Sequence, residues 1–269
     1  MLVLGATGHI GCAIAREFLQ HGYRVTATTR QQHPEALADL RVDIAQGDAD
    51  HSGQVAAWVR GHDIVVDAAA PYPVNLFIGA SAFGPKASAQ AGRRMRELLH
   101  AVSRENAVLG YVSSFSTLSH PEAEGNFAAI GTRVRRSLHP YFAVKAVMES
   151  MVLDAVRLGL RAAIVNPTAC MGPWDRRQRE LCVVPMLASG ELPAIIAGDV
   201  NIIDVRDVAS AVRAAIEQQR FGARIVLSGH NSRTDALAAR ICELAGVGAP
   251  RFRVPARLVA GGTLLAEAG

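Results

Sequence analysis

Tyr141 and Lys145, four positions apart, have the clearest chemical potential in this chain, and Lys145 is one of only two lysines among 269 residues. On a helix, side chains at i and i+4 share a face, so the lysine ammonium can lie close to the tyrosine hydroxyl. The positive charge favours phenolate and lowers the tyrosine pKa from about 10 toward neutral pH. The spacing therefore predicts an acid–base catalyst; a structural tyrosine beside a surface lysine is the alternative.

A glycine-rich turn follows an apolar run at the start of the chain. Gly5, Gly8 and Gly11 are spaced G-x-x-G-x-x-G between a predicted strand over 1–4 and a predicted helix over 11–20. Glycine lets the backbone approach a pyrophosphate, and a helix N-terminus supplies N–H donors. The strand and helix context is what this motif requires. We expect a dinucleotide site that includes the following residues, with the His9 side chain facing solvent: Gly5, Thr7, Gly8, His9, Ile10 and Gly11.

The end of the second predicted strand, residues 23–29, indicates which dinucleotide binds. NAD-binding proteins usually place Asp or Glu there to hold the ribose hydroxyls. This chain has Thr28, Thr29 and Arg30 instead. Arg30 can pair bidentately with a 2′-phosphate, although an exposed arginine without a ligand is the alternative. The strand end favours NADP over NAD.

Strand-like and helix-like segments alternate along the first two thirds of the chain. Strands are predicted over 41–46, 63–66 and 107–112, and helices over 51–60 and 87–104. This alternation predicts the α/β class, with a doubly wound parallel sheet (a Rossmann domain) covered by helices on both faces. Ligands should bind at the carboxyl ends of the strands. We assign residues 1–166 and 200–230 to the NADP-binding domain, and residues 167–199 and 231–269 to a small discontinuous C-terminal substrate lobe.

The composition and charge of the chain indicate which kinds of molecule it binds. The net charge is +4, half the residues are hydrophobic, and short arginine clusters occur at 93–96 and 133–136. We interpret these clusters as solvated faces or anion contacts, because no basic stripe is interleaved with aromatic residues as nucleic-acid binding would require. The predicted partner is a small-molecule substrate, without nucleic acid or membrane, and a homodimer is left open.

The positions of the cysteines and histidines and the start of the chain indicate the cellular compartment and whether a metal is bound. The four cysteines lie in apolar sequence without paired spacing, which predicts buried free thiols in a reducing compartment: Cys12, Cys170, Cys182 and Cys242. The histidines show no metal-ligand spacing, so no metal is expected. The chain opens on the strand and glycine turn, leaving no room for a signal peptide, and no apolar run reaches spanning length. We expect a cytoplasmic protein.

Together these motifs resemble the extended short-chain dehydrogenase/reductase superfamily, in its NAD(P)-dependent epimerase/dehydratase branch. The segments that carry the resemblance are 5–11, 47–48, 63–70, 111–114, 141–145, 166–173 and 203–209. Within the superfamily the chain is most similar to the dihydroflavonol-reductase-like group, on segments 26–30, 165–175 and 227–231.

The resemblance implies roles for particular residues. It makes Ser114, Tyr141 and Lys145 a catalytic triad, with Ser113 and Ser116 as local competitors for the serine. It also implies these cofactor contacts besides the glycine turn, Arg30 and Lys145: Asp48 and Ala49 at the adenine, Ala68, Ala69 and Ala70 at the ribose and phosphates, and Asn166, Pro167 and Thr168 beside the nicotinamide.

Other polar residues have less specific interpretations. Asp204 and Asp207 bracket a strand-to-helix junction, where Asp207 is expected to cap a helix over 208–219. Trp174 and Asp175 follow a Gly-Pro pair in a predicted substrate loop, where packing and ligand contact are both open.

The predicted function is NADPH-dependent reduction of a small or medium carbonyl compound. Sugar-nucleotide enzymes of the family usually carry Asn-x-x-Gly-Thr in the helix after Ala70, and this chain lacks that pattern. The short C-terminal lobe also suggests a pocket that is smaller or completed by a partner subunit. The first alternative is a nucleotide-sugar epimerase or dehydratase with the same triad. The second is a non-catalytic NADP-sensing regulator, against which the intact triad argues.

Overall fold

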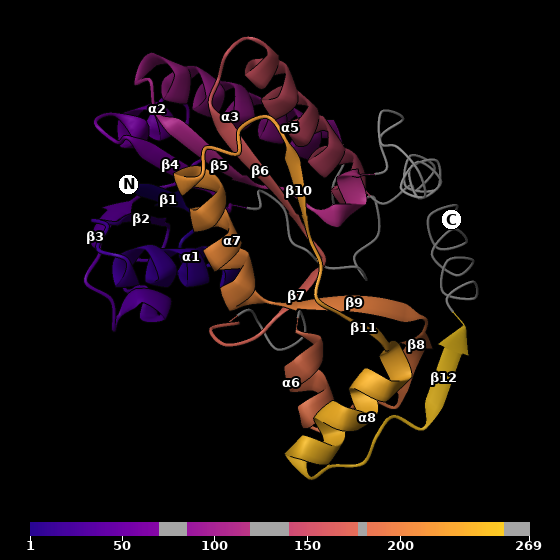
Figure 1. Cartoon of the computed structure of the whole chain (residues 1–269). Helices are drawn as coiled ribbons and strands as arrows, with labels where there is room; N and C mark the ends of the chain where they lie inside the picture. Colours follow the sequence, from indigo (N-terminus) through magenta and orange to yellow (C-terminus); the bar gives the residue numbers. More distant parts are fainter. Residues whose placement is uncertain (70–84, 119–139, 177–181, 256–269) are drawn as a thin grey trace.

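A seven-stranded parallel sheet forms the centre of the larger part of the molecule (Figure 1). The computed structural model describes residues 1–69, 85–118, 140–176 and 182–255, apart from the side chains of residues 85–88 and 140–143. The strand order is β10-β6-β5-β4-β1-β2-β3, and every pairing in it is parallel. The strands are β1 (Leu2–Leu4), β2 (Thr26–Thr29), β3 (Asp43–Gln46), β4 (Ile64–Asp67), β5 (Val108–Val112), β6 (Ala162–Pro167) and β10 (Arg224–Leu227). The expected α/β class with a Rossmann-like parallel sheet is confirmed.

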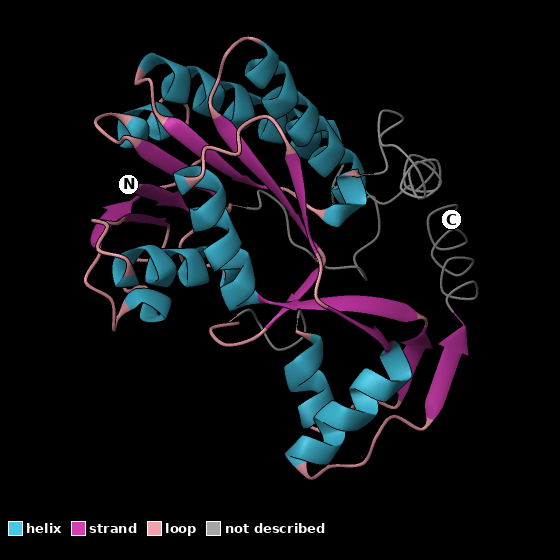
Figure 2. Cartoon of the chain, in the orientation of Figure 1, coloured by secondary structure: helices cyan, strands magenta, loops and turns pink. Residues whose placement is uncertain are grey.

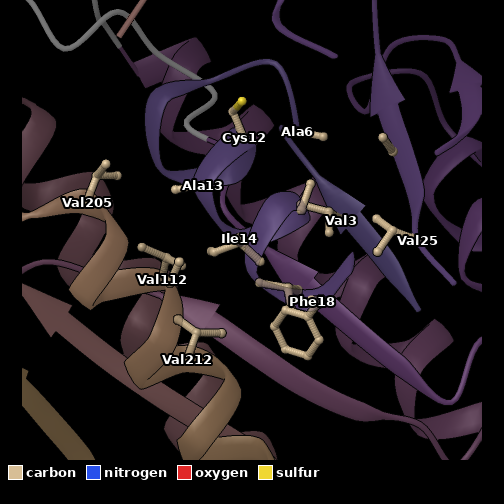
Figure 3. Packing of buried hydrophobic residues seen from close by; sticks show 14 of the residues in the cluster. Val3, Ala6, Cys12, Ala13, Ile14, Phe18, Val25, Val112, Val205 and Val212 are labelled. Atoms are coloured by element: carbon tan, nitrogen blue, oxygen red, sulfur yellow. The ribbon is translucent and has the colours of Figure 1, made fainter. Parts of the chain in front are cut away.

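Helices cover both faces of this sheet, because successive side chains of a strand point to opposite faces. The helices are α1 (His9–Gln20), α2 (Gln54–Val59), α3 (Pro85–Arg104), α5 (Pro140–Arg157) and α7 (Val205–Glu217). Leu2 and Leu4 pack with α2, α3 and α5, whereas Val3 between them packs with α1 and α7. Figure 3 shows this second layer, with Ile14 and Phe18 of α1 near Val3 and Val212.

Two smaller sheets and two helices lie apart from the large sheet (Figures 1 and 2). Their elements are β7 (Ala169–Met171), β9 (Asp199–Asp204) and β11 (His230–Arg233) in one sheet, β8 (Ala194–Ala197) and β12 (Phe252–Pro255) in the other, and the helices α6 (Val183–Ala188) and α8 (Thr234–Ala245). Leu187, Ala238 and Cys242 form a small separate core between these helices. The assignment of residues to a cofactor domain and a substrate lobe stays a prediction.

Some predicted elements begin later than the sequence suggests. The second strand covers only Thr26–Thr29, because Tyr23 belongs to the turn after α1. The Tyr23 N–H donates to the carbonyl of Phe18 at 3.0 Å, and the two rings meet edge to face with centroids 5.0 Å apart. Likewise α2 begins at Gln54, after Gly53 in a left-handed conformation (φ +81°). Within the described residues, no helix has both the length and the apolar character needed to cross a membrane.

Candidate active site

The glycine turn after β1 is a tight backbone cradle. Gly5 has φ +75°, and a Cβ there would lie 2.7 Å from the Cα of Ala69 at the end of β4. A Cβ on Gly11 would lie 2.1 Å from the Gly5 carbonyl oxygen. Gly8 is the N-cap of α1, with no side chain capping the helix. The turn therefore brings the start of α1 against β1 and β4 and presents backbone N–H groups, as a pyrophosphate requires.

His9 does not face solvent, and that expectation is wrong. It is the first residue of α1 and is only 8% exposed. Its Nδ1 lies 3.8 Å from the Asp175 carboxylate, so the segment after β7 covers it. Trp174 in the same segment packs against α1, with the Arg16 guanidinium 4.8 Å from the ring centroid. Trp174 therefore has a packing role, and ligand contact, the other role left open for it, stays a prediction.

The end of β2 consists of two buried threonines, Thr28 and Thr29, followed by the exposed Arg30. Thr28 Oγ1 accepts a hydrogen bond from the Gly5 N–H at 3.2 Å, which ties β2 to the glycine turn. Thr29 Oγ1 accepts from the Gln31 N–H at 3.0 Å. Both threonine side chains are buried and each accepts a backbone hydrogen bond, whereas Arg30, the next residue, is exposed.

Asp48 and Ala49 follow β3, on the strand next to β2. Both are half-buried, and the Asp48 carboxylate accepts a hydrogen bond from the Asp50 N–H at 3.0 Å. Ala49 packs against the hydrophobic core. Their place at the carboxyl end of a sheet strand agrees with where a nucleotide base would bind in this fold.

A buried ion pair at the end of β4 was missed by the sequence analysis. Arg94 of α3 donates to Asp67 with both terminal nitrogens, at 3.1 and 2.8 Å, and the two side chains are 2% and 0% exposed. Asp67 also accepts from the Ala69 N–H at 3.1 Å. Of the two interpretations of cluster 93–96, Arg94 is therefore not on a solvated face but in contact with an anion, the Asp67 carboxylate. The signal was available: Ala91, Arg94 and Leu98 share one helical face.

Ala68 and Ala69 follow this pair and are half-buried, whereas Ala70 lies outside the described residues. Because Arg94 fixes Asp67 and Asp67 accepts from the Ala69 N–H, the backbone here is held against the glycine turn.

Lys145 lies on α5 and reaches the end of β5. Its ammonium donates to the Val112 carbonyl at 3.0 Å, and the residue is 7% exposed. Burial lowers the pKa of Lys145 from 10.5 to about 8. The negative charge of Asp67 acts against this decrease, and the positive charge of Arg94 adds to it. Tyr141 lies one turn earlier on the same helix, and its side chain is outside the described residues.

Ser114 begins a short 3₁₀ helix, Phe115–Thr117, after β5. It is 7% exposed, and its Oγ accepts from the Ser116 hydroxyl at 2.9 Å and the Ser116 N–H at 3.3 Å. Ser113 instead faces Thr117, with the hydroxyl oxygens 3.4 Å apart. Ser114 is thus held by its neighbours beside the strand end that Lys145 contacts.

The end of β6 supplies the remaining predicted contacts. Asn166 is fully buried and donates to the Ser114 carbonyl at 3.0 Å. Pro167 is buried, and the half-buried Thr168 donates to Asn201 Oδ1 at 2.7 Å. Asn166 also donates to Glu149 of α5, at 2.6 Å. Glu149 was not identified from the sequence, although its position four residues after Lys145 places it on the same face of the helix.

The helix after β9 corrects one capping prediction. α7 begins at Val205, and Asp204 is its N-cap, accepting from the Arg206 N–H at 2.8 Å. Asp207 lies in the first turn, so its prediction as the N-cap is wrong. Asp204 caps the helix instead, because β9 runs directly into α7 and ends at this residue.

The cysteines and the possible metal ligands of the described residues were the remaining features predicted from the sequence. All four cysteines lie in the described residues and none forms a disulfide; Cys170 is half-buried, while the others are buried as predicted. Among the described residues, no group of three or more His, Cys, Asp or Glu side chains is placed to hold a metal ion.

The predicted site residues come from the carboxyl ends of neighbouring strands. β6, β5, β4 and β1 are adjacent in the sheet, so Asn166 near the end of β6 and Ser114, Ala69 and Gly5 just after the other three strands lie at one edge. A glycine turn with no room for a Cβ at Gly5 or Gly11 and a buried ammonium at the end of β5 fit a nicotinamide dinucleotide. Fold and site together define a dinucleotide-binding α/β enzyme.

The chain belongs to the NAD-dependent epimerase/dehydratase family, whose model matches residues 1–228. It is 29% identical over 278 residues to the sterol demethylase protein B of Methylococcus capsulatus, covering 99% of this chain and 80% of that protein. It is 25% identical over 276 residues to a dihydroflavonol 4-reductase of Zea mays, covering 96% of this chain and 76% of that protein. The predicted superfamily is confirmed, and the protein is an NAD(P)-dependent enzyme of the oxidoreductase type.

Solved structures show the same fold at low sequence identity. A nucleoside-diphosphate-sugar epimerase from Pseudomonas aeruginosa has a TM-score of 0.78 at 22% identity, covering 99% of this chain and 83% of that one. A double mutant of the dTDP-glucose 4,6-dehydratase from Streptomyces venezuelae, solved with NAD bound, has a TM-score of 0.72 at 19% identity, covering 94% and 84%.

Proposed function

We propose that the protein is an NADPH-dependent reductase of a small or medium carbonyl compound. The observation that carries the proposal is the buried Lys145, held at the end of β5 next to Ser114 and one turn after Tyr141. A buried cation in this position has no structural partner of opposite charge in direct contact among the described residues, which suits a catalytic role better than a purely structural one.

Each residue of the triad has a defined task in this proposal. Ser114 donates a hydrogen bond to the substrate carbonyl oxygen and polarises it. Tyr141 gives that oxygen a proton, and the Lys145 ammonium lowers the tyrosine pKa and binds the cofactor ribose. The reduced nicotinamide supplies the hydride, and the protein supplies orientation and electrostatics.

NADPH is the proposed form of the cofactor. Thr28 and Thr29 are buried and accept hydrogen bonds from backbone N–H groups, and Arg30 after them is exposed at the strand end. Arginine pairs bidentately with a phosphate, whereas an acidic residue would be needed to hold free ribose hydroxyls.

Two relatives suggest the substrate class to be tested. One is named a dihydroflavonol 4-reductase and another sterol demethylase protein B. The assay gives the purified protein NADPH or NADH with a dihydroflavonol, a steroidal ketone and small aliphatic ketones, and follows the loss of reduced nicotinamide absorbance. We expect turnover with at least one ketone and a preference for NADPH. Absence of turnover with every ketone would contradict the proposal.

A nucleotide-sugar epimerase or dehydratase is the second candidate. The Pseudomonas aeruginosa epimerase has the same fold, and its reaction class can use the same triad. UDP-glucose added with catalytic NAD tests it, since a new isomer or a dehydrated sugar would form without net loss of cofactor.

A further inference from the structure

Glu149 is a buried carboxylate at the point where three elements of the site meet. It lies one turn after Lys145 on α5 and is 2% exposed. Its Oε2 accepts hydrogen bonds from the Thr117 hydroxyl and the Asn166 amide, both at 2.6 Å. The Arg224 guanidinium of β10 is 3.6 Å from its other oxygen. A carboxylate buried this deeply needs such donors, because unpaired burial of a charge costs several kcal/mol.

The same two side chains reach the main chain of Ser114. Thr117 Oγ1 lies 2.7 Å from the Ser114 carbonyl oxygen, and Asn166 Nδ2 lies 3.0 Å from it. The single Thr117 hydrogen serves one acceptor, whereas Asn166 has two amide hydrogens and links Ser114 to Glu149 directly.

The hydrogen count shows why the carboxylate matters. Three oxygens lie within reach of Asn166 Nδ2, which has two amide hydrogens: Ser114 O at 3.0 Å, Thr117 Oγ1 at 2.9 Å and Glu149 Oε2 at 2.6 Å. The carbonyl and the carboxylate oxygens can only accept, so they take the two amide hydrogens, and the Thr117 hydroxyl donates its own hydrogen to Glu149. Without Glu149, the Asn166 amide and the Thr117 hydroxyl each lose an acceptor in a buried environment.

We propose that Glu149 is a positioning residue that holds Ser114 and Asn166 in register with Lys145, a role that rests on the proposed function. It joins α5, which carries Tyr141 and Lys145, to the end of β5, which carries Ser114, and to the end of β6, which carries Asn166. Reaction rates respond strongly to such alignment, since a displacement of about 1 Å can reduce turnover about 100-fold.

Two substitutions of Glu149 separate its acceptor role from its charge. Glu149→Met has similar length and no acceptor, so turnover should fall about 10- to 100-fold while the dissociation constant of NADPH changes little. Glu149→Gln keeps one carbonyl acceptor for Thr117 and Asn166, so it should retain most of the activity. Arg224→Gln removes only the ion pair and is the matched control, with a smaller loss expected than in Glu149→Met.

A second measurement needs no substrate. Amide hydrogen exchange of residues 113–118 should be faster in Glu149→Met than in the wild-type protein. The reason is that the turn bond from the Thr117 N–H to the Ser114 carbonyl, 3.1 Å long, loses its side-chain support. If Glu149→Met does not fold, Thr117→Val replaces it, because that change removes the hydroxyl between Ser114 and Glu149 and should give the same two effects.

The outcomes separate this proposal from the proposed function. Unchanged turnover or unchanged exchange in Glu149→Met would overturn the positioning role. An equal loss of turnover in Arg224→Gln would also overturn it. A weaker binding of NADPH that accounts for the whole loss of turnover in Glu149→Met would do the same. A wild-type protein without reductase activity contradicts the proposed function instead, and the exchange measurement then still decides the role of Glu149.

Discussion

Lys145→Met should stabilise the folded protein at neutral pH, by an amount that shrinks as the pH rises. Burial lowers the pKa of Lys145 from 10.5 to about 8. Because the pKa is lower in the folded protein, the unfolded chain binds more protons between these two values, and wild-type stability rises with pH across that interval. At 1.36 kcal/mol per pH unit, the ammonium costs the folded state about 3 kcal/mol at neutral pH. Losing the hydrogen bond to the Val112 carbonyl offsets about 1 kcal/mol of the gain.

The assay is urea unfolding of both proteins, followed by circular dichroism at constant ionic strength. The difference in unfolding free energy between Lys145→Met and wild type should decrease by about 2 kcal/mol between about pH 7 and about pH 9.5. Arg157→Met is the control, since it removes a side chain from the same helix that is 61% exposed. Its difference from wild type should be constant over this range.

A difference that does not change with pH in Lys145→Met would refute the reasoning. It would mean that the lysine titrates alike in the folded and unfolded states, so that the ammonium is not desolvated at the end of β5. The burial of Lys145, which is the observation that carries the proposed function, would then be contradicted.

Three further predictions concern cofactor binding and the transfer of a proton to the substrate. Tyr141→Phe should bind NADPH nearly as well as wild type and lose about 100-fold or more in turnover, the usual share of general acid catalysis; near-normal turnover would remove Tyr141 from the mechanism. Arg30→Asp should shift the ratio of NADPH and NADH dissociation constants toward NADH, and an unchanged ratio would show that Arg30 points away from the ribose. Gly11→Ala places a Cβ 2.1 Å from the Gly5 carbonyl oxygen, so thermal unfolding should show lower stability and no stabilisation by NADPH; normal binding would contradict the tight cradle.

The parts of the fold that follow from local periodicity were predictable. Apolar runs separated by amphipathic segments indicated strands and helices in alternation, and the parallel sheet with helices on both faces confirms them. The tight turn predicted at Gly5 and Gly11 is present, since a Cβ at either residue would clash with protein backbone, whereas their contact with a pyrophosphate stays a prediction. The family was also correctly predicted. The roles of the triad stay predictions.

What the sequence did not reveal depends on contacts between distant segments. Arg94 looked like part of a solvated cluster because its partner, Asp67, lies 27 positions away. Glu149 looked like an ordinary helix residue, because the donors that make it special come from Thr117 and Asn166 on other elements. His9 was expected in solvent, since nothing local shows that the segment with Asp175 would cover it. Polar residues inside the protein are specified by tertiary partners, whereas strand and helix patterns are specified by their neighbours in the chain.

The most direct test of the central claim is the stoichiometry of cofactor and product. The purified protein is incubated with a ketone substrate and a measured excess of NADPH, and oxidised cofactor and alcohol are quantified together. A reductase that uses Ser114, Tyr141 and Lys145 should form one alcohol for each NADPH consumed. Sustained turnover with only catalytic amounts of cofactor, and a product isomeric with the substrate, would contradict the reductase and favour the epimerase.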